Sequence, residues 1–535
     1  MAAGLALRLA GAGSGLPSRS LSLRTYHPDE SIVLYSVAAM EPAKLDFHPR
    51  ESLDWGSLYT YAVAAALKAA SLAGYVERRE RAFFEANLRE ADKLYLAGRA
   101  VSVLAGTASV ALVFMAGEVL LGAPAALLAA LLAAVAAAPV ALSVYLKPDP
   151  LMLMFGCLAV YFSALILKGR GARACMWAGL SVGLAAAAKY NGAVFIVVPL
   201  TAALLAGDRK FWQIPLFFAA GFLAGCPYSF LAPRDFIKSF SVWVGMGTQA
   251  VPPWNYGLHE GLAGYFSHYL RYAFGWPLTA AMALSLAWPF AAGPLKKAGW
   301  RSAVPDRTAA FLLLPAAGIL LLLALSSRKM ALYSAPAWPL LFLLTAKAAA
   351  EIFGLAGAAG RKALAALGCL LAAHAFVYTA AYVSLFTGRD AREEASAWIT
   401  ANVPKGSVVG LTKKYFWTPP ALRGPASGYE TRSFRDDTFN LSEGVLSLKA
   451  AAGGADYLVL SDFEIKDFLR LPGVYPAENA ALRELLEGKF SLAASFAKSP
   501  SFLGFTFPRG EPPWDWAYPN PIIYVYRKQA PRTPA

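Results

Sequence analysis

The sequence predicts an α-helical polytopic membrane protein with a C-terminal soluble α/β domain. Hydrophobic residues make up 57% of the 535-residue chain and charged residues only 16%, against about 25% charged residues in an average soluble protein. The mean hydropathy is +0.45 and the formal net charge is +15. Because the basic residues lie in short clusters between apolar runs, we attribute this charge to membrane topology and expect no nucleic-acid partner.

Apolar runs separated by charged residues or proline predict the membrane-spanning helices. Residues 1–16 are apolar, but a helix needs about 20 residues to cross the hydrocarbon core, and Arg8 interrupts this run. This leader is either the tail of a first helix or a sign that the start of the chain is misplaced. A signal peptide is less favoured, because its basic residue would lie ahead of the apolar run and Arg8 lies inside it. Including the leader, we expect about eleven crossings. The other runs cover residues 97–121, 124–145, 150–167, 174–206 (two short helices broken near Lys189), 211–231, 275–294, 308–326, 331–355 and 363–386.

The loops between these spans fall on two sides of the membrane. Clusters of Lys and Arg recur in alternate loops, which the positive-inside rule assigns to the cytoplasm. The opposite loops, including residues 25–96 and the long loop 227–274, are then extracytoplasmic, together with everything after about residue 387. Within residues 25–96, Ser31–Met40 is amphipathic and Gly56–Tyr75 is more apolar, so we expect interfacial helices there.

The chain changes character after the last span, so we divide it into a membrane domain, residues 1–386, and an α/β domain, residues 387–535. The second domain contains no nucleotide-binding loop, no Ser-His-Asp order and no zinc-ligand spacing, and we assign it a binding or scaffolding role. Its expected helices are Ala391–Asn402 and Ala480–Leu486, and its expected strands are Ser407–Leu411, Asp456–Ser461 and Ile522–Arg527.

The four cysteines lie within or at the edge of apolar segments. They show no metal-ligand spacing, so we interpret them as small core residues and expect no disulfide framework. They are Cys157, Cys175, Cys226 and Cys369.

A polar stretch near the start, Tyr26-His27-Pro28-Asp29-Glu30, carries two adjacent carboxylates. In so apolar a protein, an acidic pair at the mouth of the membrane needs water, a partner or a function. The alternative is a helix start, because carboxylates favour the first turn of a helix and proline tends to precede it. We select Asp29 as the leading candidate for a catalytic residue.

Other polar side chains gather on the same predicted side, which indicates a site at the outer membrane face. Transfer of a sugar from a polyprenyl phosphate would suit such a site, since it needs a base for the acceptor, cations for the departing phosphate and a cavity between lipid and water. The residues that gather there are His27, His48, His259, His268, Asp149, Arg328 and Lys329.

Several motifs carry a resemblance to a known superfamily. They are HPDE, AGRAVSVLAG, KPDP, AGLSVGLAAAAKYNG, RKMALYSAPAWPLL and AREEASAWITANVPKGS. Over roughly residues 20–410, the chain resembles the GT-C superfamily of polyprenyl-phosphate-sugar glycosyltransferases, with the protein O-mannosyltransferases and the lipid A aminoarabinose transferases as its nearest branches. The large inserted β-domain of eukaryotic protein mannosyltransferases is absent, which argues for a prokaryotic-type enzyme.

The resemblance implies a role for each matching residue. Asp29 matches the acid that acts as the base or orients the acceptor, and Glu30 is its neighbour in the acidic pair. Asp149 matches the acid at the outer end of the third span, and we group these three as catalytic candidates. The remaining matches imply binding of the donor phosphate, by Arg99, Lys189, Arg328, Lys329 and Tyr333.

These matches also have structural interpretations. Arg99 at the end of a span could snorkel to the interface, and Asp149 between two prolines could cap a helix. Lys189 is harder to explain in this way, because a lysine between apolar half-helices is costly unless it is paired or hydrated. Arg328 and Lys329 lie outside against the positive-inside pattern, which favours a phosphate partner.

The histidines suggest a divalent metal as an alternative. His27 lies two residues before Asp29, while His259 and His268 belong to another outer loop, so two loops together could supply a site. A lone histidine in an amphipathic loop is usually only a polar side chain, and some members of the superfamily work without a metal. We therefore assign no certain cofactor.

The resulting prediction is an inverting glycosyltransferase of a prokaryotic plasma or inner membrane, with its site and its α/β domain extracytoplasmic. Its partners are a polyprenyl-phosphate sugar donor and a protein, lipid or glycan acceptor, and Asp29 is the base. A polyprenyl-lipid transporter or flippase is the main alternative, but it predicts internal repeats that the sequence lacks. A third interpretation is a membrane anchor for the α/β domain. An anchor needs only one span, and it leaves the polar outer loops unexplained.

Overall fold

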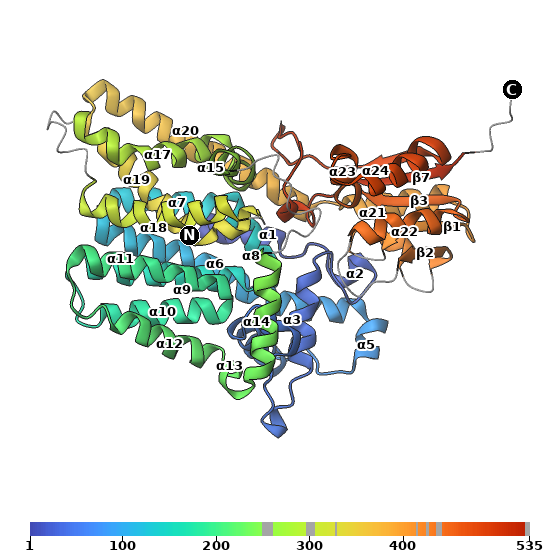
Figure 1. Ribbon diagram of the computed structural model, residues 1–535, viewed down its shortest axis with the longest axis horizontal. Helices are drawn as coiled ribbons and strands as arrows, with labels where there is room; N and C mark the ends of the chain where they lie inside the picture. The colour runs from blue at the N-terminus through green and yellow to red at the C-terminus, as the bar shows by residue number, and fades with distance from the viewer. Residues whose placement is uncertain are drawn as a thin grey trace.

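The computed structural model describes residues 1–248, 261–295, 305–326, 329–413, 416–423, 427–434 and 441–529. A large bundle of helices forms one side of the molecule, and a smaller region of strands and helices from the end of the chain forms the other (Figure 1). Each side has its own hydrophobic core.

The bundle contains short helices near its start and longer apolar helices after them. They are α1 (Ala2–Gly11), α2 (Pro17–Ser20), α3 (Pro28–Ala38), η1 (Pro42–Lys44), η2 (Arg50–Asp54), α4 (Leu58–Leu72), α5 (Arg81–Ala86), α6 (Leu88–Leu121), α7 (Ala123–Val135), α8 (Ala137–Val144), α9 (Asp149–Leu167), α10 (Ala174–Ala188), η3 (Tyr190–Ile196), α11 (Val197–Ala206), α12 (Gln213–Gly225), α13 (Tyr228–Leu231), α14 (Pro233–Thr248), α15 (Gly261–Gly264), η4 (Tyr265–Leu270), α16 (Arg271–Phe274), α17 (Trp276–Leu295), α18 (Arg307–Leu325), η6 (Ala331–Ala337), α19 (Trp338–Leu355) and α20 (Ala358–Thr387).

By length and composition, five helical segments of the described residues could cross a membrane, and α7 with α8, bent by 49°, could form a sixth. The chain is therefore an integral membrane protein, but this measure does not reach the expected count of about eleven. The reason is that several apolar runs form helices of only 10–17 residues. The run 174–206 breaks as predicted at Lys189, whose backbone is extended (φ −154°, ψ 130°). The five segments are Leu88–Leu121, Asp149–Leu167, Arg307–Leu325, Ala331–Leu355 and Ala358–Asn402.

The start of the chain is built into the bundle. The leader forms α1, a helix of 10 residues that packs against α8 and α20 and buries Leu7 and Arg8. The two expected helices of the first loop are α3 and α4, within two or three residues of the predicted bounds. Helix α6 begins at Leu88, nine residues before the predicted span, so a polar extension precedes its apolar part.

The end of the chain forms a mixed five-stranded sheet in the order β2-β1-β3-β7-β4. Strands β1, β2 and β3 are parallel, and β7 pairs antiparallel with both β3 and β4. The strands are β1 (Val408–Lys413), β2 (Glu430–Phe434), β3 (Tyr457–Ser461), β4 (Phe490–Phe496), the hairpin β5 (Ser501–Phe502) with β6 (Phe505–Thr506), and β7 (Ile523–Lys528). The helices are α21 (Ala391–Asn402), η7 (Pro420–Leu422), α22 (Leu441–Ala452), α23 (Asp462–Arg470), α24 (Pro476–Arg483), η9 (Glu484–Lys489) and η10 (Trp514–Trp516).

The three predicted strands are the central ones, β1, β3 and β7. The edge strands β2 and β4 escaped the prediction because they carry little buried apolar surface; β4 has a single buried residue, Phe490. Of the predicted helices, Ala391–Asn402 is α21 at the expected bounds, and its capping box of Asp390 and Glu393 explains its sharp start. The second, Ala480–Leu486, is the junction of α24 and η9.

All four cysteines are free thiols. Three of them are buried as predicted, but Cys369 is exposed on α20. The expectation that it is a core residue was wrong, because the buried residues of α20 begin only at Ala375 and Cys369 lies before them.

Candidate active site

A cavity of about 890 Å³ lies between the helical bundle and the end of the chain. Much of its wall is apolar and comes from α8, α18 and η6, whereas η10 and the residues after it close another side. A mostly apolar cavity with a few convergent polar groups is the usual form of a ligand site. The polar groups on its wall include His27, Asp29, Asp54, Lys147, Lys189, Asn191, Tyr333 and Asp515.

Asp29 lies in the first turn of α3 and faces this cavity. His27 is the N-cap of the helix and its Nδ1 accepts a hydrogen bond from the Asp29 backbone N–H at 3.3 Å, while Pro28 occupies the first helical position. The side chain of Asp29 keeps 31% of its surface exposed. The stretch is therefore a helix start, and it also leaves the Asp29 carboxylate accessible.

Glu30 points the other way and is completely buried with Arg99. The Arg99 Nε and Nη2 each donate to a Glu30 oxygen at 2.8 Å, and Leu146 N donates to the same carboxylate at 2.8 Å. The Arg99 Nη1 donates to the carbonyls of Ala12 and Ser14 at 2.6 and 2.8 Å. Neither residue is on the cavity wall. These contacts form a buried ion pair that ties α1, α3 and α6 together.

Lys147 lies against Asp29 on the cavity wall. Its Nζ is 3.3 Å from Asp29 Oδ2 and 3.4 Å from His27 Nε2. Burial acts to lower the pKa of Lys147, but the carboxylates of Asp29 and Asp149 outweigh it and raise the pKa. The side chain is therefore an ammonium at neutral pH.

His27 is held between two aromatic rings. Its ring centroid lies 4.6 Å from that of Tyr145 and 4.3 Å from that of Tyr518. Burial, aided by the charge of Lys147, holds the pKa of His27 well below its usual value. The imidazole is therefore neutral, and it orients the start of α3 without contributing charge.

Asp149 and Lys189 form a second ion pair beside the first. The Lys189 Nζ donates to Asp149 Oδ1 at 2.7 Å. Asp149 is fully buried at the start of α9, and its Oδ2 has no hydrogen-bond partner in the described part of the chain. Lys189 lines the cavity and Asp149 does not. Two lysines thus reach the cavity, each with a carboxylate partner.

The structure describes two of the three residues predicted at the outer turn, Lys329 and Tyr333. Arg328 lies outside the described residues, and Lys329 donates to the carbonyl of Ser326 at 3.0 Å without lining the cavity. Tyr333, in η6, does line it.

The structure describes two of the three histidines proposed for a metal, His27 and His268. His268 packs against the rings of Tyr269 and Tyr272, and His259 lies outside the described residues. Across the ranges that the structure describes, no three His, Cys, Asp or Glu side chains are grouped so that they could hold a metal ion.

Sequence reasoning missed Lys147 and the wall formed by Trp514, Asp515 and Trp516. Lys147 belongs to the KPDP turn, and a lysine beside an apolar helix is as costly without a partner as Lys189, so the same argument could have found it. The tail residues gave no such signal, because η10 is a short helix that only the fold brings to the cavity.

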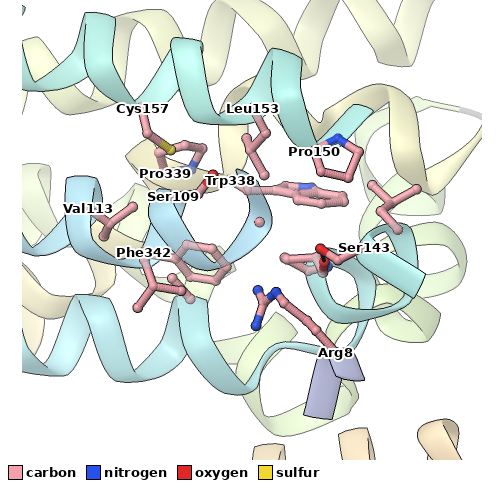
Figure 2. A pocket seen from close by; sticks show the side chains of 15 residues that line it. Arg8, Ser109, Val113, Ser143, Pro150, Leu153, Cys157, Trp338, Pro339 and Phe342 are labelled. Atoms are coloured by element: carbon pink, nitrogen blue, oxygen red, sulfur yellow. Dashed lines mark hydrogen bonds between the residues drawn. The ribbon is translucent and has the colours of Figure 1, made fainter. Parts of the chain in front are cut away.

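A second pocket, of about 20 Å³, surrounds Arg8 and has room for about one water molecule. Figure 2 shows the Arg8 side chain pointing into it, with Ser143, Trp338 and Phe342 on its walls. The Arg8 Nη1 donates to the carbonyls of Gly4 at 2.8 Å and Ala134 at 3.3 Å. This residue, which seemed to interrupt the leader, therefore joins α1 to the end of α7.

Comparison with known proteins supports the fold. The family model described as dolichyl-phosphate-mannose-protein mannosyltransferase matches residues 91–229. The structure of ArnT from Cupriavidus metallidurans bound to undecaprenyl phosphate is similar over 98% of this chain and 96% of that chain, with 14% sequence identity and a TM-score of 0.53. AglB, an oligosaccharyltransferase from Archaeoglobus fulgidus in complex with an inhibitory peptide and a dolichol-phosphate, gives 11% identity and a TM-score of 0.48 over 92% of this chain and 73% of its own. A search by sequence among curated proteins found no match.

The fold and the site define an integral membrane protein with an amphipathic cavity and paired charges at its polar end. The family-model match covers residues 91–229, and the fold of the chain as a whole is similar to that of ArnT.

Proposed function

We propose that this protein transfers a sugar from a polyprenyl-phosphate-linked donor to an acceptor at the outer face of the membrane, with inversion at the anomeric carbon. The observation that carries the proposal is the Asp29 carboxylate, accessible on the wall of a mostly apolar cavity and 3.3 Å from the ammonium of Lys147. The pair supplies a base and a cation at one point.

In this mechanism, Asp29 accepts the proton of the acceptor hydroxyl or amine. The acceptor attacks the anomeric carbon from the face opposite the phosphate, and the bond between that carbon and the phosphate oxygen breaks. A positioned base typically contributes about 10²–10⁴-fold to the rate of such a step. The electron pair leaves with the polyprenyl phosphate, whose new charge needs a cation.

Lys147 and Lys189 are the residues proposed to meet that charge. Both reach the cavity, and a lysine ammonium beside a phosphate oxygen gives a strong, charge-assisted hydrogen bond. When phosphate is absent, the carboxylates of Asp29 and Asp149 keep these ammonium groups paired. Arg328, Lys329 and Tyr333 stay candidates for the same phosphate from the adjoining turn.

The apolar wall supports a lipid-linked donor. Side chains of α18, among them Ile319, Leu322 and Leu323, offer a surface on which a polyprenyl chain could lie. The superfamily member from Cupriavidus metallidurans is described as bound to undecaprenyl phosphate, which makes this lipid the first donor scaffold to try. The acceptor, whether protein, lipid or glycan, stays open.

The test is donor consumption. Purified protein in lipid is offered a panel of labelled polyprenyl-phosphate sugars with a cell extract as the source of acceptor, and release of free polyprenyl phosphate is measured. Consumption of one donor supports the proposal and names the sugar. If no donor is consumed, the proposal fails and a lipid-flipping assay becomes the next experiment.

A further inference from the structure

The tail of the chain returns to the membrane helices through a short hairpin. Strands β5 and β6 pair antiparallel, and Leu503 and Gly504 form the turn between them. Of the described large apolar side chains, none is more exposed than Leu503, at 80%, and Phe505 beside it is 61% exposed. A single exposed leucine is ordinary, but two neighbouring apolar side chains at the tip of a hairpin form a surface that suits an apolar partner.

This hairpin lies alongside the second half of α20. The Phe502 ring packs against the Phe376 ring, with centroids 6.2 Å apart, and Ser501 N donates to Ser384 Oγ at 3.3 Å. At about 1.5 Å per residue, Phe376 lies about 16 Å along α20 from its end at Thr387. The hairpin is therefore beside the body of this helix and well below its end.

Helix α20 belongs to a segment that is long and apolar enough to cross a membrane. Its apolar run continues to Phe386 in the sequence, so the part beside the hairpin lies within the span. On earlier turns of the same helix, Leu367 and Leu370 are 61% and 67% exposed, as expected for side chains that face lipid. The surface formed by Leu503 and Phe505 thus adjoins a helix that faces the bilayer.

The turn carries a residue that is poorly suited to water. Leu503 has a φ of 47° and Gly504 a φ of 82°. Two-residue hairpin turns with positive φ at both positions usually carry Asn-Gly or Asp-Gly, because a short polar side chain tolerates the left-handed backbone and a leucine is strained there. A polar residue would suit both the backbone and water, so the leucine indicates an apolar surrounding for the tip.

Backbone groups beside lipid need hydrogen-bond partners. Strands β5 and β6 pair with each other, Phe507 N donates to the Pro500 carbonyl at 2.9 Å, and Ser501 N is the group bonded to α20. These bonds lower the cost of placing the hairpin next to acyl chains. An apolar tip of this kind suits the boundary between headgroups and acyl chains.

We infer that the β5–β6 hairpin inserts Leu503 and Phe505 into the lipid beside α20 and so attaches the tail to the bilayer directly. The partner of this surface is the acyl region of the membrane leaflet on the side of the tail. The attachment holds one end of the segment that leads from the hairpin to η10 on the cavity wall. This inference is independent of the proposed function, because it concerns only the surroundings of the hairpin.

The test measures whether lipid or water surrounds residue 503. A nitroxide is attached to Leu503→Cys in a Cys369→Ser background, and the protein is reconstituted in lipid nanodiscs. Electron paramagnetic resonance then compares the collisions of the nitroxide with oxygen, which concentrates in lipid, and with a nickel chelate, which stays in water.

The matched control is Leu446→Cys in the same background, at a leucine that is 41% exposed on α22. Helix α22 packs against β1 and β2, at the edge of the sheet away from β4. Insertion of the hairpin predicts an oxygen-to-nickel collision ratio several-fold higher at residue 503 than at residue 446. Cys369, which is exposed on α20, gives the reference ratio for a lipid-facing position when the wild type is labelled.

Two results would overturn the inference. A ratio at residue 503 equal to that at residue 446 would place the tip in water. Low collision rates with both reagents would place it against protein, such as a second copy of the chain. If Leu503→Cys fails to fold, Phe505→Cys carries the same prediction.

Discussion

The ammonium of Lys147 lies 3.3 Å from the carboxylate of Asp29, and both groups line the same cavity. The pair is only partly withdrawn from solvent, because the Asp29 side chain is 31% exposed while that of Lys147 is 8% exposed. The cation is therefore largely buried with one side on the cavity, and the carboxylate is the more accessible of the two partners.

Replacing the cation tests the phosphate site. Lys147→Met keeps the length of the side chain and removes its charge, so we expect affinity for polyprenyl phosphate to fall by about 10–100-fold, the range for hydrogen bonds to charged groups. Equilibrium binding of the labelled lipid measures it. Lys168→Met, which removes an exposed lysine at the far end of α9, is the matched control. Unchanged affinity in Lys147→Met would remove this residue from the site.

The pair of Glu30 and Arg99 is expected to act on stability. Glu30→Gln leaves the Arg99 charge buried without its partner, and breaking such a pair costs about 3–5 kcal/mol. Thermal unfolding in detergent should show a large fall in the midpoint, while the fraction that stays folded keeps its affinity for polyprenyl phosphate. Full stability with lost turnover would instead return Glu30 to the catalytic group.

Glu464 gives a pH-dependent prediction away from the membrane. It is buried in α23, where burial raises its pKa from 4.5 to about 7. As the pH rises, this carboxyl therefore loses its proton in the unfolded chain before it does in the folded protein. The free energy of unfolding falls as a result between about pH 4.5 and pH 7. Glu464→Gln has no proton to lose at this position. Its free energy of unfolding should therefore exceed that of the wild type by almost nothing at pH 4 and by up to about 3 kcal/mol at pH 8.

Unfolding midpoints of Glu464→Gln and wild type across that pH range provide the measurement. Gln can keep both contacts of the native carboxyl, with Ser461 N and the Thr412 hydroxyl. Equal midpoints at pH 8 would contradict the raised pKa.

Local patterns predicted the elements that depend on them. Hydropathy found the long apolar helices, the break at Lys189 and the central strand β3, all of whose residues are buried. The acidic pair was recognised, but its two members could not be told apart. One helical step turns Asp29 to the cavity and Glu30 to Arg99, and that choice depends on where α6 packs.

The missed features arise from contacts between distant parts of the chain. Asp515 reaches the cavity only because the tail docks on the bundle, where the Arg392 guanidinium lies 3.8 Å from the centre of the Tyr26 ring and Arg19 pairs with Glu393 at 2.7 Å. Side-chain burial also sets the surroundings of Arg99: the sequence suggested a snorkelling or phosphate-binding residue, and the structure places its guanidinium in the buried pair with Glu30. Neither property has a local signature.

The most direct test of the account is donor turnover by Asp29→Asn beside the wild type, with affinity for polyprenyl phosphate measured on the same preparations. The substitution keeps the size of the side chain and removes the base, so we expect the release of polyprenyl phosphate to fall by about 10²–10⁴-fold while the lipid binds with nearly unchanged affinity. Turnover at the wild-type rate by this variant would show that Asp29 is not the base and would contradict the proposed mechanism.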